Sequence, residues 1–205
     1  MTDIEVSRRE RKKDETRERI FKVAIKLFRD RGFDRTTIDD ITEKADVAKG
    51  TFFNYFPKKD AVLAYLSETR LVAVEENAGA MLAATKPTAD KLVGIYEFAA
   101  TAYEEDRDLS RFVINELMSR AFAPNEEPGV RWQKLVLDVI EGGRAAGELR
   151  GDLDAVRAES LLSSVYMSTV YLWLNCNEAQ FDLREELRAR LTLVLEGCAA
   201  RKIAP

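Results

Sequence analysis

Histidine is absent from this chain of 205 residues, and there are only two cysteines, Cys176 and Cys198. Without an imidazole base, catalysis by Ser-His or Cys-His arrangements is excluded, and so are most zinc sites. Two cysteines are too few for a disulfide scaffold, and we interpret both as small buried residues of apolar helical patterns. The sequence therefore predicts no metal site and no cofactor.

Long apolar runs are also missing. No stretch approaches the roughly 20 residues that a helix needs to cross a bilayer. The N-terminus is polar, and no apolar segment follows its basic residues, as one would in a secretory signal. We therefore expect a cytoplasmic protein without a membrane span. A Gly-rich phosphate loop is absent as well, and we interpret the acids at 104–106 as a solvated helix end. These absences argue against an enzyme.

The charge is distributed unevenly along the chain, although the net charge is only −4. Residues 1–59 hold 16 Lys and Arg against 12 Asp and Glu, a net of +4, whereas residues 60–205 have a net of −8. Basic residues cluster at 8–13, which we interpret as a flexible basic arm or a frayed helix start. The asymmetry favours contact between the N-terminal segment and a polyanion.

Apolar residues recur at helical spacing throughout, and no alternating strand pattern occurs. The sequence therefore predicts an all-α fold with a DNA-binding domain over 1–57 and a larger helical domain over 58–205. The expected helices are 16–31, a short helix after Thr37, 48–55, a helix opened by Pro57, 89–105, 109–122, 130–146, 154–175 and 182–199.

Three helices near the N-terminus have the spacing of a helix-turn-helix. Thr37 and Asp40 form a capping-box pattern for the second helix, and a short turn separates it from the third. Phe52 and Phe56 give the third helix an apolar inner face. Its outer face is small and polar, carrying Lys49, Gly50, Thr51 and Asn54. Lys can donate to guanine and Asn can pair with adenine in the major groove.

The stretch 16–66 resembles the DNA-binding region of TetR-family transcriptional regulators. The residues that carry this resemblance are Ala24, Leu27, Phe28, Gly32, Phe33, Thr37, Ile41, Ala45, Val47, Lys49, Gly50, Thr51, Tyr55, Phe56 and Lys59. The resemblance implies phosphate contacts from Thr37, Tyr55 and Lys59. It implies positions near the bases for Arg35, Thr36, Lys49, Gly50, Thr51 and Asn54. This sequence departs from the family at Asp46, Ala48 and Phe53, where Gly, Ser and Tyr are usual.

The remaining helices are rich in aromatic residues, which suit either an ordinary core or the walls of a small-molecule pocket. The resemblance implies an inducer site in this domain. The candidate pocket residues are Tyr96, Tyr103, Phe112, Met118, Trp132 and Tyr166. Because the domain has no histidine and few lysines, we expect a small, largely apolar ligand rather than a metal or a strongly anionic molecule.

The segment 154–175 is apolar nearly all round, as a helix buried on every side would be. Family members pair through their last two helices, and this sequence fits that arrangement. The candidate dimer residues are Leu162, Val165, Thr169, Trp173, Leu187, Leu191 and Val194.

Together these patterns predict a ligand-responsive transcriptional repressor that binds an inverted-repeat operator on double-stranded DNA as a homodimer. Two alternatives remain: an enzyme, and a helical carrier whose helix-turn-helix is vestigial. The intact Lys49-Gly50-Thr51 segment and Lys59 argue against the carrier.

Overall fold

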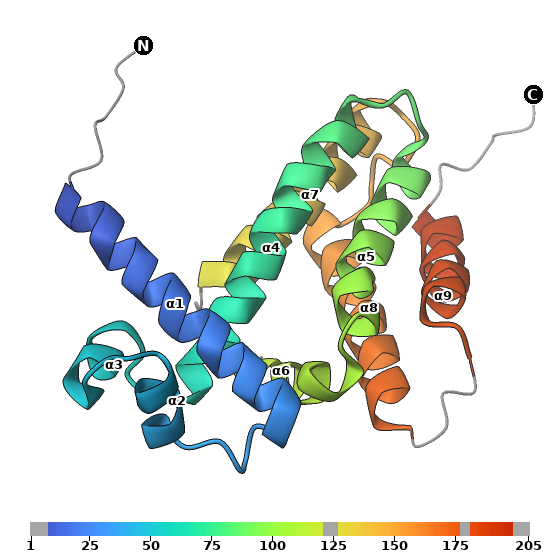
Figure 1. Cartoon of the computed structure of the whole chain (residues 1–205). Helices are drawn as coiled ribbons and strands as arrows, with labels where there is room; N and C mark the ends of the chain where they lie inside the picture. The colour runs from blue at the N-terminus through green and yellow to red at the C-terminus, as the bar shows by residue number, and fades with distance from the viewer. Residues whose placement is uncertain (1–7, 121–126, 177–180, 199–205) are drawn as a thin grey trace, which may run out of the picture. The chain divides into compact units, whose positions relative to one another are not determined.

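The computed structural model describes residues 8–120, 127–176 and 181–198, and every regular element in those ranges is an α-helix (Figure 1). The predicted all-α fold is confirmed. The helices are α1 (Arg8–Arg31), α2 (Ile38–Lys44), α3 (Lys49–Tyr55), α4 (Asp60–Ala83), α5 (Thr88–Glu104), α6 (Arg107–Arg120), α7 (Glu127–Ala145), α8 (Ala155–Asn175) and α9 (Leu183–Cys198). No helix of the described ranges is long and apolar enough to cross a membrane.

Two helix starts differ from the sequence prediction. Helix α1 begins at Arg8, so the basic segment from there to Glu15 is helical, while residues 1–7 and the side chains of Arg8 and Arg9 lie outside the described part. Helix α4 begins at Asp60 rather than at Pro57, which lies in a bend. The backbone N–H of Ala61 donates to the carbonyl of Lys58, which forms a tight turn at the start of α4.

The chain divides into two compact units between Leu66 and Ser67, within α4 rather than before it. The reason is that the first turns of α4 pack in the first unit. The Tyr65 ring meets Phe21 of α1 edge to face, with ring centroids 4.9 Å apart, and Val62 is fully buried. Helix α4 is therefore part of both units.

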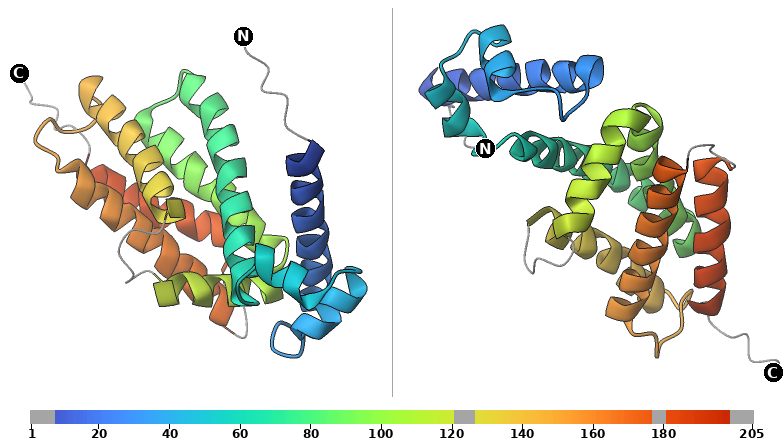
Figure 2. Two further views of the ribbon diagram at one scale, coloured as in Figure 1. Left: turned by 90° about the vertical axis from the view of Figure 1, so that its left-hand side faces the viewer. Right: turned by 90° about the horizontal axis from the view of Figure 1, so that it is seen from below.

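The core of the second unit lies among α5, α7, α8 and α9, and Figure 2 shows α8 and α9 side by side. Residues at helical spacing fill it, among them Leu92, Ile95 and Tyr96 of α5 and Leu187 and Leu191 of α9. Asp154 caps α8 by accepting from the backbone N–H of Arg157, which favours a helix start at this point.

Helices α5 and α7 come close to each other at Gly143. A Cβ at this position would lie 2.5 Å from Cγ2 of Thr88, the first residue of α5. The same turn is fixed by the Glu148 carboxylate, which accepts from the Thr88 backbone N–H at 2.6 Å. Any larger residue here would therefore force the Thr88 side chain to shift.

We predict that Gly143→Ala destabilises the protein, because the added methyl group overlaps Thr88 in a packed contact. Gly142→Ala is the matched control: its Cβ would have no neighbour within 4 Å, so the better helix propensity of Ala should leave stability equal or raised by up to about 1 kcal/mol. Thermal unfolding followed by circular dichroism compares the two, and equal Tm values would contradict the close approach.

Candidate functional site

A tight turn joins α2 to α3 in the first unit. The Thr37 side chain accepts from the Asp40 backbone N–H, and the Asp40 carboxylate accepts from the Thr37 backbone N–H. This capping box matches the sequence prediction, and its hydrogen bonds hold the pKa of Asp40 below the usual range. Asp46 adopts φ 51° in the turn, a left-handed backbone that Asp tolerates. Ala48 precedes α3 without a side-chain cap.

Helix α3 has one buried and one exposed face. Phe52 is fully buried, and its ring centroid lies 5.8 Å from that of Phe56 at the end of the helix. Lys49, Gly50 and Asn54 are exposed on the other face, as a helix lying in a major groove requires. Two further predicted contacts, Thr51 and Tyr55, are half-buried.

Phe53 and an ion pair complete the exposed face of α3. Phe53 is 48% exposed, although a buried position would be usual for so large an apolar side chain. The Lys49 ammonium lies 2.6 Å from the Asp39 carboxylate of α2. Both partners are mostly exposed, so the pair contributes little to stability and costs little to break. Lys49 can therefore exchange Asp39 for another acceptor.

In the loop between α1 and α2, the Thr36 side chain contacts backbone carbonyls of the protein itself. Gly32 has φ 86°, and the Phe33 ring packs on Phe28 at 4.9 Å between centroids, as predicted for this helix end. Thr36 is only 1% exposed, and its hydroxyl lies 3.3 Å from the Leu27 carbonyl and donates to that of Gly32 at 2.8 Å. The Thr36 hydroxyl is therefore engaged within the loop, and its predicted position near a base stays a prediction.

Lys59 ties the same loop to the start of α4. Its ammonium donates to the carbonyls of Phe33 at 2.7 Å and Thr36 at 2.9 Å, and it lies 4.2 Å from the centroid of the Phe33 ring. Lys59 is half-buried. Its role within the protein is thus to hold the loop, and a phosphate contact would have to use what remains of its donor capacity.

Arg35 and Thr37 remain at the exposed edge of this loop. The Arg35 Nε donates to the Arg31 carbonyl at 2.7 Å, and the Thr37 hydroxyl donates to the Asp40 carboxylate at 2.6 Å. Both residues are exposed. Their positions relative to the chain are fixed by these hydrogen bonds, which leaves the rest of the Arg35 guanidinium available to an anion.

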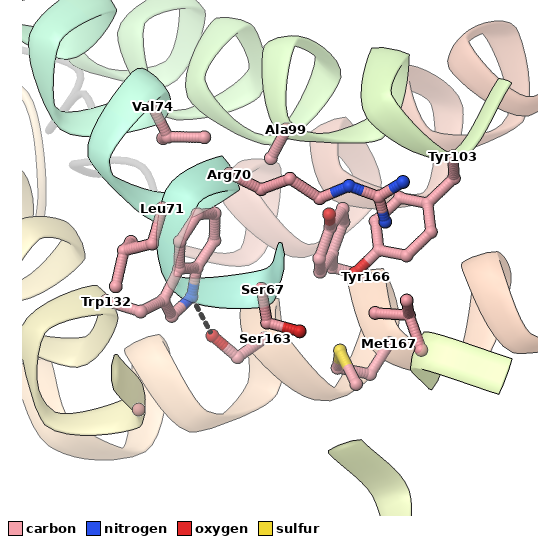
Figure 3. A pocket seen from close by; sticks show the side chains of 12 residues that line it. Ser67, Arg70, Leu71, Val74, Ala99, Tyr103, Trp132, Ser163, Tyr166 and Met167 are labelled. Atoms are coloured by element: carbon pink, nitrogen blue, oxygen red, sulfur yellow. Dashed lines mark hydrogen bonds between the residues drawn. The ribbon is translucent and has the colours of Figure 1, made fainter. Parts of the chain in front are cut away.

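The second unit contains a largely apolar pocket of about 240 Å³. Helix α4 supplies part of its wall, with helices α5 to α8 around it, and Figure 3 shows the lining side chains. The lining residues are Ser67, Arg70, Leu71, Val74, Ala99, Tyr103, Val113, Gly129, Trp132, Ser163, Tyr166 and Met167. Such apolar walls with a few polar groups are the usual make-up of a small-molecule site.

Aromatic residues form a rigid wall of this pocket. Trp132 stacks on Tyr166, with centroids 5.7 Å apart and an interplanar angle of 18°, and meets Tyr96 edge to face. The Trp132 Nε1 donates to the Ser163 hydroxyl at 3.1 Å, and that hydroxyl donates to the buried Glu159 carboxylate at 2.7 Å. Burial raises the pKa of the Tyr96 and Tyr166 phenols, so both rings stay neutral at physiological pH.

Three of the six predicted pocket residues line it: Tyr103, Trp132 and Tyr166. Tyr96 does not belong to the lining; it is fully buried, in edge-to-face contact with Trp132, and its hydroxyl lies 3.2 Å from that of Ser163. Phe112 is half-buried on α6 and lies outside the lining set. The Met118 side chain falls outside the described residues.

Arg70 of α4 is a pocket residue that sequence reasoning missed. Its Nη2 donates to the Ala102 carbonyl at 2.8 Å and to the Ser110 hydroxyl at 3.3 Å. Burial lowers the pKa of the guanidinium, while neighbours including Tyr103 oppose this change. No sequence motif marks Arg70, because its surroundings come from helices far along the chain. A cationic side chain in the pocket lining also argues against our expectation that the ligand has no anionic group.

Four of the seven predicted dimer residues lie in the core of their own chain instead. Leu162, Thr169, Leu187 and Leu191 are each 1% exposed or less, so these four side chains offer almost no surface to a partner. Val165, Trp173 and Val194 are half-buried and pack partly against the same core.

The exposed apolar residues of α8 and α9 lie one position away from several of these. Leu161 and Leu172 of α8 are 58% and 44% exposed, and Leu193 of α9 is 72% exposed. Leu161 and Leu172 share one face of α8, since their separation is close to a whole number of helical turns. Ser164 and Ser168 add small side chains to that face of α8, and the exposed Ala189 lies one turn before Leu193 on α9. Small residues permit a second helix to approach closely.

Comparison with known proteins gives matches along nearly the whole chain. A family model described as bacterial regulatory proteins of the tetR family matches residues 20–66. A second, described as the C-terminal domain of TetR/AcrR family transcriptional repressors, matches residues 69–197, more than half of the chain. Both describe transcriptional regulators, which confirms the expectation of a regulator rather than an enzyme.

Individual relatives agree with these models. Thermus thermophilus FadR, described as a TetR-family repressor in complex with lauroyl-CoA, is 32% identical with a TM-score of 0.75, covering 92% of this chain and 98% of that one. The repressor KstR2 of Rhodococcus jostii is 23% identical over 90% of this chain and 91% of its own length. The Bacillus subtilis regulator YerO is 28% identical over 61% of this chain, but the match spans only 43% of YerO.

We predict that Lys59→Met lowers the free energy of unfolding by about 1–3 kcal/mol, because two carbonyls of a half-buried loop lose their charged donor. Lys58→Met, at the adjacent exposed position, should change stability by no more than about 0.5 kcal/mol. Urea unfolding followed by circular dichroism measures both. Equal stability of the two variants would mean that Lys59 does not hold the loop.

Proposed function

This chain belongs to the tetR family of bacterial regulatory proteins, and we propose that it is a ligand-responsive repressor of the cytoplasm. It binds an inverted-repeat operator as a homodimer and is released by an effector that enters the pocket of the second unit. The observation that carries this proposal is the combination of an exposed polar face on α3 with an apolar pocket lined partly by α4.

The proposed reading surface is the exposed face of α3. Lys49 and Asn54 donate to base edges, and Gly50 lets the backbone come close to the groove. Phe53 faces the same side and suits an apolar contact with a thymine methyl group. Arg35, Thr37 and Tyr55 contact phosphates or bases beside it. Asp39 holds the Lys49 side chain until DNA replaces it.

The proposed dimer surface is the exposed face of α8 and α9 that contains Leu161, Leu172 and Leu193. Apolar side chains exposed to this degree on adjacent helices favour burial against a partner. A second copy of the chain would supply the same surface, and a two-fold dimer would place two α3 helices against two half-sites.

The proposed effector is an acyl compound with a long apolar chain. Two facts support this class: the lining of the pocket is mostly apolar, and the relative from Thermus thermophilus, 32% identical, holds lauroyl-CoA. The link to DNA is α4, which carries Ser67, Arg70, Leu71 and Val74 in the pocket and Val62 in the core of the first unit. An effector that favours one position of α4 alters the operator affinity.

We predict that selection of bound DNA from a random pool yields an inverted repeat. Asn54→Ala should relax the preference at one position of each half-site by about 1–3 kcal/mol. Tyr55→Phe, by contrast, should weaken binding to all duplexes alike, because Tyr55 is expected to contact a phosphate rather than a base. Selected sequences without a repeat, or equal losses on specific and random DNA for Asn54→Ala, would contradict the proposal.

We predict that Leu193→Asp gives a folded monomer, because the charge falls on an exposed position of the proposed dimer surface. Leu191→Asp, two residues away, should unfold the protein, because Leu191 is fully buried in its own chain and an unpaired charge there is costly. Circular dichroism and sedimentation velocity are measured on both variants. A folded dimer in Leu193→Asp would remove α9 from the interface.

A further inference from the structure

The two terminal nitrogens of the Arg70 guanidinium differ in their hydrogen bonds within the protein. Its Nη2 donates to the Ala102 carbonyl and the Ser110 hydroxyl. Ala102 lies in the last turn of α5, where carbonyls lack partners within the helix and the helix dipole favours a cation. The Nη2 nitrogen therefore has a structural role. The other terminal nitrogen, Nη1, is buried and has no hydrogen-bond partner among the described residues.

The surroundings make that unused donor costly. Arg70 lines a pocket whose neighbouring walls are apolar, with Leu71, Val74 and Ala99 among them, and Figure 3 shows its guanidinium beside the rings of Tyr103 and Tyr166. Burial lowers the pKa of the group, which means that its charge is poorly solvated there. A buried donor without an acceptor is unfavourable, and more so when it is charged.

The Ser163 hydroxyl, another polar group of the pocket lining, has all of its hydrogen-bond partners. The Ser163 hydroxyl donates to Glu159 at 2.7 Å and accepts from Trp132 at 3.1 Å, with the Tyr96 hydroxyl 3.2 Å away. One donor and two lone pairs are therefore all engaged. A ligand gains little from Ser163, whereas an acceptor atom placed at Arg70 would satisfy a buried charged donor.

We propose that Arg70 is the residue that selects the polar group of the effector, by donating from Nη1 to an acyl carbonyl or carboxylate oxygen while the apolar chain lies against the aromatic and aliphatic walls. This inference rests on the proposed function only for the presence of an acyl effector. The oxygen can come from a free fatty acid or from an acyl thioester, because both present a carbonyl oxygen on an apolar chain.

The test compares two probes that differ in that oxygen alone. Dodecanoyl-CoA has the thioester carbonyl, and the thioether S-dodecyl-CoA lacks it. Calorimetry on the unaltered protein should show dodecanoyl-CoA binding about tenfold to a hundredfold more tightly, the size expected for one hydrogen bond to a charged group. Dodecanoate is the third probe, and its affinity relative to dodecanoyl-CoA tells which source the site prefers. Equal affinities for the first two probes, or no binding of either, would overturn the inference without any variant.

Arg70→Gln should abolish the discrimination between the two coenzyme A probes, so that the ratio of their affinities falls to within about twofold of one. Arg111→Gln is the matched control, because the Arg111 Nε also donates to a carbonyl near a helix end, that of Leu174, and Arg111 does not line the pocket. The control should retain the full discrimination. Retained discrimination in Arg70→Gln, or an equal loss for both probes, would assign Arg70 a purely structural role.

Operator binding is measured separately on the same proteins. If the protein selects an operator but does not discriminate the carbonyl, the role of Arg70 is refuted and the repressor proposal stands. A chain that discriminates the carbonyl but binds no operator refutes the repressor proposal alone.

Discussion

A charged group inside an apolar pocket must be satisfied or it destabilises the fold, and this constraint organises the second unit. The Arg70 Nη2 has partners: it donates to the Ala102 carbonyl at the end of α5 and to the Ser110 hydroxyl of α6. The two contacts attach α4 to α5 and α6 through one side chain. Its other terminal nitrogen, Nη1, is buried without a hydrogen-bond partner among the described residues, and Arg70 lines the pocket. The same side chain that stabilises the packing therefore gives the pocket its chemical preference, and it does so from the helix that continues into the first unit.

The first unit satisfies its polar groups in the opposite way. Thr36 and Lys59 have side chains suited to DNA, yet both donate to carbonyls of the loop between α1 and α2. Their hydrogen bonds hold the loop that leads into α2, and α2 begins with the capping box at Thr37. Fewer side chains are left to contact DNA, namely those on the exposed face of α3 and at the edge of the loop. Preorganisation of this kind lowers the entropy cost of binding, because the reading helix is held before DNA arrives.

Helical periodicity and capping patterns predicted most of the fold, because these signals are local. The capping box at Thr37, the left-handed Asp46 and the buried Phe52 could all be inferred from neighbouring residues. The face of α8 could not, because that helix is apolar nearly all round and its orientation is decided by distant packing. The prediction chose Leu162, whereas Leu161 is the exposed neighbour. Arg70 was missed for a related reason: its partners are supplied by α5 and α6, and nothing in its own helix indicates them.

In the proposed function, one chain couples an acyl ligand in the second unit to DNA held by the first. Coupling between two sites is reciprocal, so each ligand must change the affinity of the other by the same factor. The direct measurement is calorimetric titration of dodecanoyl-CoA into the protein alone and into the protein saturated with its selected operator. The expected result is an affinity about 5–150-fold weaker on the operator complex, equal to the weakening of operator binding by the ligand. Equal affinity in the two titrations would contradict the coupling.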